Sequence, residues 1–309
     1  MAGTTLIAGA TGYIGRLLAL RFAEGGRPPR AIARSRERGR ALARAGCEVV
    51  EADVLRPETL QRALADVDVA YYLVHSMGRG GDGDFAERDR EGALNFARAA
   101  ADARVGRIVY LGGLSDGGSK HLESRHATAG HLGSTGVPVT YLRAAAVIGA
   151  GSESFLTVYY LVRRLPVMIT PRWVGTRTQP IAIDDVVAYL AQAPSIAGAT
   201  GRSIEIGGPE VTTYGGMMDS LAEAMGTRPR PRLPVPLLTP YLSSLWIGLI
   251  TPVDAGVAQP LVEGLSSETV VRDRSGMEMF DVEPTPLGEA MRSAVDEAGG
   301  GRGQGRGRA

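Results

Sequence analysis

The sequence TTLIAGATGYIGRLLALRFAEGG, residues 4–26, decides how the first half of this chain folds. A short apolar run ends at three glycines, Gly9, Gly12 and Gly15, and apolar residues then recur at helical spacing. This order predicts a strand, a tight turn and a helix. In such a turn the first glycine allows an unusual backbone angle, the second lets a phosphate approach, and the third lets helix and strand pack closely. The stretch therefore predicts that the pyrophosphate of a dinucleotide binds at the start of the helix.

A merely structural turn is the alternative, because a chain with 42 glycines contains such triplets by chance. The context favours a cofactor site, since the glycines follow a predicted strand, open a helix and lie in the first βαβ unit. The residues of this turn that we expect to contact the cofactor are Gly9, Thr11, Gly12, Tyr13, Ile14 and Gly15.

The composition indicates a folded protein with a small-molecule partner. Hydrophobic residues make up 44% of the 309 residues, and the net charge is +1, which favours neither a disordered chain nor a nucleic-acid binder. The single cysteine, Cys47, excludes an internal disulfide, and four unpatterned histidines give no reason to expect a metal. We expect no signal peptide and no transmembrane segment, and hence a cytoplasmic protein.

Short apolar runs alternate with amphipathic segments through the first half of the chain. This pattern predicts an α/β fold, a doubly wound parallel sheet of the Rossmann type, with its ligand crevice at the carboxyl ends of the strands. We expect an NAD(P)-binding domain over residues 1–150 and a smaller C-terminal substrate lobe over residues 151–298, partly interleaved with the sheet. A disordered tail is expected over residues 299–309.

The end of the second predicted strand is followed by Arg34, Ser35 and Arg36. In this fold an acid at that place binds the free 2′-hydroxyl of NAD(H), whereas an arginine accommodates the 2′-phosphate of NADP(H). No acid stands there, so the sequence favours NADP(H) over NAD(H), with Arg34 as the main phosphate contact, Arg36 or Arg38 in support and Ser35 beside them. The alternative is that these arginines form the solvated face of the next helix, which we prefer for Arg38 and Arg40.

Two further predicted strands end in polar residues. Asp53 and Val54 follow the third strand, where an acid suits a hydrogen bond to the adenine amino group. The alternative is that the Asp53 carboxylate only accepts hydrogen bonds from nearby backbone N–H groups. The fourth strand leads into His75 and Ser76, where the nicotinamide half of a dinucleotide would extend.

With these residues placed, the chain resembles the short-chain dehydrogenase/reductase superfamily in its extended and atypical branches, and within it the NmrA-like, NAD(P)H-binding group. The resemblance covers roughly residues 4–225. The motifs that carry it are GATGYIG at 9–15, YYLVHSMG at 71–78, RIVYLGGLS at 107–115, GVPVTYLRAAAVIG at 136–149 and TQPIAIDDVV at 178–187.

Catalytic members of that superfamily carry a Tyr and a Lys four residues apart, on one face of the helix after the fifth strand. By this resemblance His121 stands in the Tyr place and Arg125 in the Lys place, so the usual dyad is absent. His121 is a candidate acid because imidazole titrates near neutrality, and Arg125 is suited to hold a ribose hydroxyl or a carbonyl. Ser115 stands where the family's helper serine donates to a substrate oxygen. The alternative for His121 is a surface residue near a helix start.

The second half of the chain contains the candidate substrate-binding residues. Trp173 and Arg172 offer a flat apolar wall with a cation beside it, which suits a planar or carbonyl-bearing ligand. Gln179 is expected to face the same crevice. A tryptophan that is plain core is the alternative.

The sequence leaves three functions open. The first is an NADP(H)-dependent oxidoreductase acting on an apolar or aromatic carbonyl, enone or quinone. The second, motivated by the missing dyad, is a non-catalytic NAD(P)H-binding redox sensor or assembly protein. The third is a nucleotide-sugar epimerase-like enzyme, which the same absence weakens. Homodimers are common in the superfamily, and a homodimer is left open here.

Overall fold

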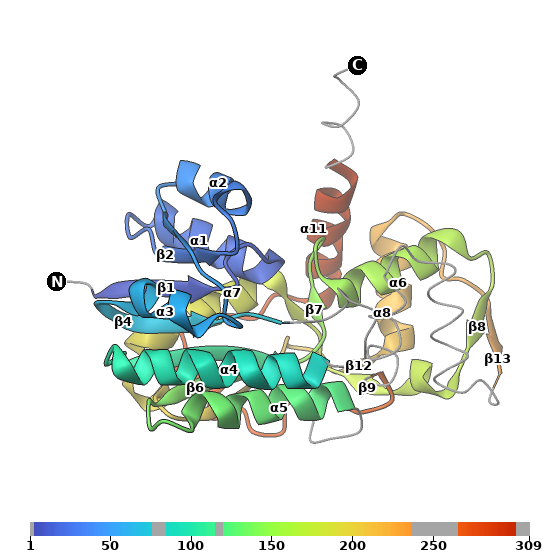
Figure 1. The fold of residues 1–309 in the computed structure, drawn as a ribbon. Helices are drawn as coiled ribbons and strands as arrows, with labels where there is room; N and C mark the ends of the chain where they lie inside the picture. Colours follow the sequence, from blue (N-terminus) through green and yellow to red (C-terminus); the bar gives the residue numbers. More distant parts are fainter. Residues whose placement is uncertain (1–2, 76–84, 115–119, 236–264, 301–309) are drawn as a thin grey trace, which may run out of the picture.

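A parallel sheet forms the centre of the computed structural model, which describes residues 3–75, 85–114, 120–235 and 265–300 (Figure 1). Its seven strands lie in the order β11-β6-β5-β4-β1-β2-β3, and every neighbouring pair is parallel. The order reverses between β1 and β4, which confirms the doubly wound α/β fold. The strands are β1 Thr4–Ala8, β2 Arg30–Ala33, β3 Glu48–Glu51, β4 Val67–Tyr72, β5 Arg107–Gly113, β6 Val139–Ala144 and β11 Ser203–Ile206.

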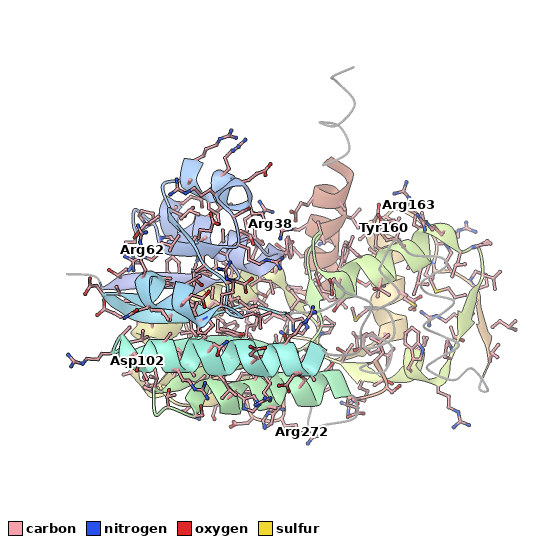
Figure 2. All side chains as sticks on the ribbon, viewed as in Figure 1. Arg38, Arg62, Asp102, Tyr160, Arg163 and Arg272 are labelled. Carbon is pink, nitrogen blue, oxygen red and sulfur yellow. The ribbon has the colours of Figure 1, made fainter. Side chains whose placement is uncertain are left out.

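Helices cover both faces of the sheet because successive strand residues point to opposite sides. In β1, Leu6 and Ala8 join the hydrophobic cluster under α3, α4 and α5, whereas Ile7 joins the cluster under α1, α2 and α7. The helices of the first face are α3 Pro57–Leu64, α4 Phe85–Asp102 and α5 Lys120–Gly133, and those of the second are α1 Tyr13–Glu24, α2 Arg36–Arg44 and α7 Ile183–Gln192. Charged side chains such as Arg62, Asp102 and Arg272 stay at the surface (Figure 2).

A third hydrophobic cluster forms the lobe beside the sheet. It is built around α6 Glu153–Arg164, α8 Tyr214–Ala224 and α11 Leu287–Gly300, which lie together in Figure 1. The remaining strands are β7 Val147–Ile148, β8 Met168–Thr170, β9 Arg177–Thr178, β10 Ile181–Ala182, β12 Thr212–Thr213 and β13 Arg232–Pro234, and they form two-stranded pairs β10–β7, β12–β9 and β13–β8. The described residues also contain four 3₁₀ turns, η1 Arg172–Gly175, η2 Ala193–Ser195, η3 Ala197–Ala199 and η4 Met277–Met279.

The two halves of the sequence are interleaved in space. Both α7 and β11 come from the second half, yet α7 packs on the central sheet and β11 forms its edge strand. Helix α11 runs to Gly300, two residues into the segment expected to be a tail; residues 301–309 lie outside the described residues. In the described ranges no helix is both long and apolar enough to cross a membrane.

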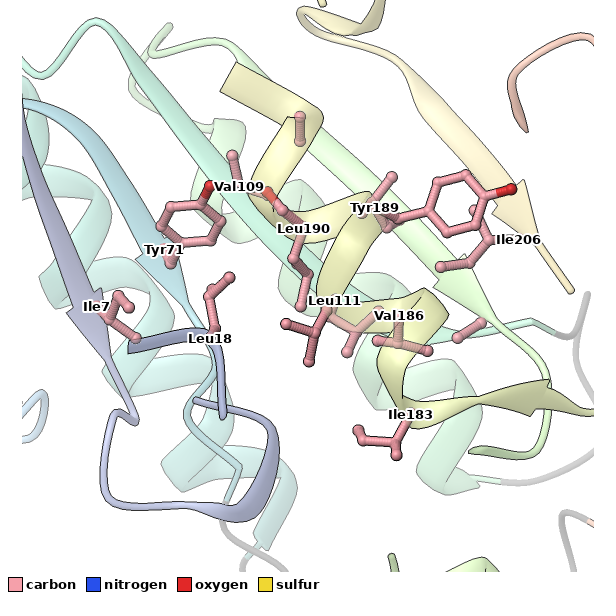
Figure 3. Close-up of a cluster of buried hydrophobic side chains, with 14 of the residues drawn as sticks. Ile7, Leu18, Tyr71, Val109, Leu111, Ile183, Val186, Tyr189, Leu190 and Ile206 are labelled. Carbon is pink, nitrogen blue, oxygen red and sulfur yellow. Dashed lines mark hydrogen bonds between the residues drawn. The ribbon is translucent and has the colours of Figure 1, made fainter. Parts of the chain in front are cut away.

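The packing of α7 on the sheet includes a buried hydrogen bond at Tyr71 (Figure 3). The Tyr71 hydroxyl donates to the carbonyl oxygen of Leu190 at 2.8 Å, and both residues are fully buried. In a regular helix that carbonyl would accept from the residue four positions on, but this residue is Pro194, which has no N–H. The tyrosine therefore supplies the donor that the proline lacks.

We expect Tyr71→Phe to lower the free energy of unfolding by about 1 to 2 kcal/mol, because it leaves the Leu190 carbonyl buried without this donor. Urea unfolding followed by circular dichroism measures the change. Tyr189→Phe is the matched control: its ring is buried in the same cluster, and its hydroxyl makes no hydrogen bond within the described residues. A loss for Tyr71→Phe no larger than for Tyr189→Phe would contradict this role of the hydroxyl.

Candidate functional site

The glycine turn between β1 and α1 is formed as the sequence predicts. Gly9 has a φ of +85°, a left-handed conformation, and its carbonyl accepts a hydrogen bond from the Gly12 N–H at 2.9 Å. A Cβ at Gly9 would meet the backbone carbonyl of Leu73, and a Cβ at Gly15 would meet the carbonyl of Gly9. No side chain caps α1 at Gly12, so the first N–H groups of the helix remain available to an anion.

A cavity of about 430 Å³ begins at this turn and continues into the lobe. It passes the carboxyl ends of β4, β5 and β6 and reaches α6, η1 and α8. The expected site residues that line it are Gly9, Gly12, Tyr13, Ile14, Gly15, His75, Arg125 and Trp173. One continuous space thus joins the predicted cofactor turn to the predicted substrate lobe.

The residues expected at the adenosine end lie outside this cavity, at the ends of β2 and β3. Arg34 is exposed directly after β2, and the Ser35 hydroxyl caps α2 by accepting from the Arg38 N–H at 3.4 Å. One carboxylate oxygen of Asp53 accepts from the Leu55 N–H at 3.0 Å, as the local alternative predicts. Thr11 is exposed in the glycine turn, and Val54 is buried.

Three polar side chains meet where β4 and β5 end. Nδ1 of His75 lies 3.3 Å from a carboxylate oxygen of Asp89, which is buried on α4. Burial lowers the pKa of His75, and the hydrogen bond to Asp89 opposes this shift. Arg125 reaches this corner from α5, and its Nη2 donates to the Leu111 carbonyl at 3.1 Å. The cavity therefore has a charged corner between its two halves.

Sequence reasoning missed Asp89. The only signal was its spacing, because Asp89 precedes the buried Ala93 and Phe96 by four and seven positions and so shares their inward helix face. An acid on that face needs a buried partner. In the structure that partner is His75.

The expected acid and helper residues are placed only in part. His121 is the second residue of α5, so it stands four positions before Arg125 on the helix that the resemblance implies, but its side chain is not described. Ser76 and Ser115 lie outside the described residues. Of the three expected catalytic side chains, the structure places Arg125 at the cavity.

Of the three candidate substrate residues, Trp173 lines the cavity, and Arg172 and Gln179 lie outside its lining. Trp173 is buried on η1, lines the cavity and packs edge-on against Tyr214, with ring centroids 6.1 Å apart. Arg172 is exposed and does not line the cavity. Gln179 is buried, and its side-chain amide joins two loops. Nε2 donates to the Gly208 carbonyl at 2.6 Å, and Oε1 accepts from the Val271 N–H at 3.0 Å. We therefore no longer place Arg172 or Gln179 at the substrate.

Residues 9–149 match a protein-family model described as NAD(P)H-binding. A ceramide reductase from Caulobacter vibrioides is 26% identical over 244 residues, which are 76% of this chain and 74% of that protein. A 4-hydroxy-2-methyl-3-oxo-4-farnesyl-3,4-dihydroquinoline-1-oxide ketoreductase from Stigmatella aurantiaca is 29% identical over 108 residues, 35% of this chain and 32% of that relative. The structure of a Citrobacter sp. triphenylmethane reductase complexed with NADP(H) has a TM-score of 0.75 at 20% identity, covering 94% of this chain and 99% of that chain.

The structural likeness shows the fold, and the family match confirms the class of cofactor that the glycine turn predicts. The matched model supports NAD(P)H binding for the nucleotide-binding part of the chain, residues 9–149.

We expect Gly12→Ala to weaken NADPH binding by roughly tenfold or more, because the added methyl group occupies the space that the pyrophosphate needs. The backbone at Gly12 is extended, and a Cβ there lies 3.2 Å from the Gly9 carbonyl oxygen, so the variant folds with a small local shift. Fluorescence titration with NADPH measures the affinity. Gly130→Ala on α5 is the control, because a Cβ there meets no atom within 4 Å. Unchanged affinity in Gly12→Ala would place the dinucleotide elsewhere.

Proposed function

We propose that this chain, whose residues 9–149 match a family model described as NAD(P)H-binding, is an NADP(H)-dependent reductase of an apolar, carbonyl-bearing small molecule. The single observation that carries the proposal is the continuous cavity, which joins the glycine turn to the apolar lobe past Arg125. A dinucleotide laid along the strand ends would direct its nicotinamide toward that lobe.

The substrate half of the cavity is mainly apolar. Its walls come from α6, η1 and α8, and the lining side chains there are Thr157, Val158, Leu161, Trp173, Tyr214 and Met217. Such a lining favours a ligand with a large apolar part and few polar groups. The names of the two curated relatives, which include a farnesyl-bearing quinoline oxide and a ceramide, support the same class of substrate.

A bound NADPH supplies a hydride to the carbonyl carbon, and the carbonyl oxygen takes up a proton. Arg125 lines the cavity between the two halves, and its guanidinium brings a positive charge there. That charge stabilises the negative charge that develops on the oxygen during the transfer. Since a guanidinium does not give up a proton, the proton comes from another group.

Cofactor binding without chemistry is the second candidate, and one observation favours it. By the resemblance, His121 and Arg125 stand where catalytic members of the superfamily carry the Tyr and Lys of the dyad. An epimerase of nucleotide sugars fits less well, because the many hydroxyls of a sugar need polar partners that the apolar half of the cavity does not offer.

The test of the proposed function is NADPH oxidation in the presence of apolar ketones, enones and quinones, with the reduced product identified by mass spectrometry. We expect at least one class of acceptor to be reduced. Tight NADPH binding without oxidation by any acceptor would favour the non-catalytic function. A protein that binds no pyridine nucleotide would contradict both.

We expect Arg34→Ala to raise the dissociation constant of NADPH by roughly tenfold, the value of one exposed charge-assisted hydrogen bond of about 1.5 kcal/mol, and to leave that of NADH nearly unchanged. The physical reason is that Arg34 would pair with the 2′-phosphate that only NADPH carries. Arg40→Ala is the matched control, since Arg40 is an exposed arginine on α2. Equal effects on both cofactors would assign the arginine to the solvated surface instead.

A further inference from the structure

His75 occupies the border between the two halves of the cavity. It directly follows Leu73 and Val74 at the end of β4, and all three residues line the cavity together with Arg125. Its side chain is 23% exposed, and its Nδ1 lies 3.3 Å from the Asp89 carboxylate. A buried acid that orients one imidazole nitrogen while the ring borders a ligand space is an arrangement suited to proton transfer.

We propose that His75 exchanges the proton with the substrate oxygen and that Asp89 positions the imidazole for this task. The proposal rests on the proposed function, because it assigns a role within the same reduction. His75 is the catalytic residue, and Asp89 acts through it. His75 thereby takes the part that the sequence assigns to His121.

The geometry determines which nitrogen carries the exchangeable proton. An ionised carboxylate only accepts hydrogen bonds, so Nδ1 must donate its proton to Asp89. The exchangeable proton then belongs to Nε2, on the opposite side of the ring. Nε2 is covered by the surrounding protein, so the proposal requires the ring or a neighbouring side chain to move before a substrate oxygen contacts it.

The step balances in atoms and electrons. In reduction, the C–H bond at C4 of the nicotinamide breaks with its electron pair and a C–H bond forms at the carbonyl carbon, so that NADPH becomes NADP⁺. The Nε2–H bond of the imidazolium breaks, an O–H bond forms, and neutral His75 remains. Water then restores the proton. In the reverse direction neutral His75 takes the proton from the alcohol.

Within the described residues, the charged and titratable groups near His75 come from four elements, α4, α5, β4 and β5. Asp89 on α4 raises the pKa of the imidazole, whereas burial and the Arg125 charge on α5 lower it. Tyr72 and Tyr110, on β4 and β5, are buried tyrosines whose pKa values are raised by burial, so they stay neutral. The imidazole is therefore mostly neutral at neutral pH, and the protonated fraction grows as the pH falls.

The direction of the pKa shift of His75 determines the expected pH dependence of the reaction. For reduction, kcat/KM falls as the pH rises through an apparent pKa below the usual value of about 6.5, and for oxidation of the alcohol it rises over the same range. Asp89→Asn moves the transition to lower pH, because it removes the negative charge that stabilises the imidazolium.

The decisive variant is His75→Gln, because a glutamine amide still donates to Asp89 but does not titrate. We expect it to retain the fold and NADPH binding, to lower kcat roughly 100-fold or more, and to abolish the pH transition. His126→Gln is the control, since His126 is exposed on α5 and does not line the cavity. A merely structural pair would be rescued by the glutamine, so wild-type kcat with an unchanged pH profile in His75→Gln would overturn the proposal.

A second measurement separates this proposal from the proposed function. Nuclear magnetic resonance of the ring nitrogens is practical with four histidines, and the His75 signal is assigned by its loss in His75→Gln. We expect a proton on Nδ1 in neutral His75, and a change at Nε2 when NADPH is added. If no acceptor oxidises NADPH, the proposed function fails. If the Nε2 resonance of His75 does not change when NADPH is added, the proposed role of His75 is overturned even in an active enzyme.

Discussion

The close approach of three backbone segments at Gly9 is the constraint on which the rest of the structure depends. A Cβ at Gly9 would meet the carbonyl of Leu73, which follows β4, and a Cβ at Gly15, near the start of α1, would meet the carbonyl of Gly9. This approach brings the amino end of α1 to the same edge of the sheet as the end of β4. The anion-binding N–H groups and His75 therefore border one cavity, although they are far apart in sequence.

The lobe is held against this edge by elements that return to the sheet. Helix α7 packs on α1 and against Tyr71 of β4, which lies beside Leu190 in Figure 3, and β11 pairs with β6 along Ser203–Ile206. In the sequence, α7 and β11 lie between η1 and α8. Because α7 and β11 are attached to the sheet, the apolar wall at Trp173 has a fixed place relative to the glycine turn. A cavity shared by two halves of a chain needs this kind of anchoring.

The sequence predicts those parts of the site that local contacts determine. The glycine turn is set by residues within one βαβ unit, and the fold follows from the alternation of strands and helices. The places of Asp89 and Gln179 depend on partners distant in sequence. The Gln179 amide joins residues 29 and 92 positions away, and no local pattern encodes such a pairing. Asp89 carried a weak signal, because helix periodicity places it on the buried face but does not name the group it meets.

The resemblance to the short-chain dehydrogenase/reductase superfamily implies that Arg125 stands where catalytic members carry a lysine, and this exchange would change what the rest of the site must do. In the usual dyad, a lysine lowers the pKa of a tyrosine that itself supplies the proton. Arg125 keeps the positive charge, yet its hydrogen bond to the Leu111 carbonyl holds it at the end of β5, and Tyr110 donates its hydroxyl to the Arg125 carbonyl. The Tyr110 hydroxyl is hydrogen-bonded to the backbone, and burial raises its pKa. Among the described side chains of this corner, the imidazole of His75 is therefore the group suited to exchange a proton near neutral pH. The buried carboxylate of Asp89 then has a physical purpose, because a buried histidine beside an arginine would otherwise resist taking up a proton.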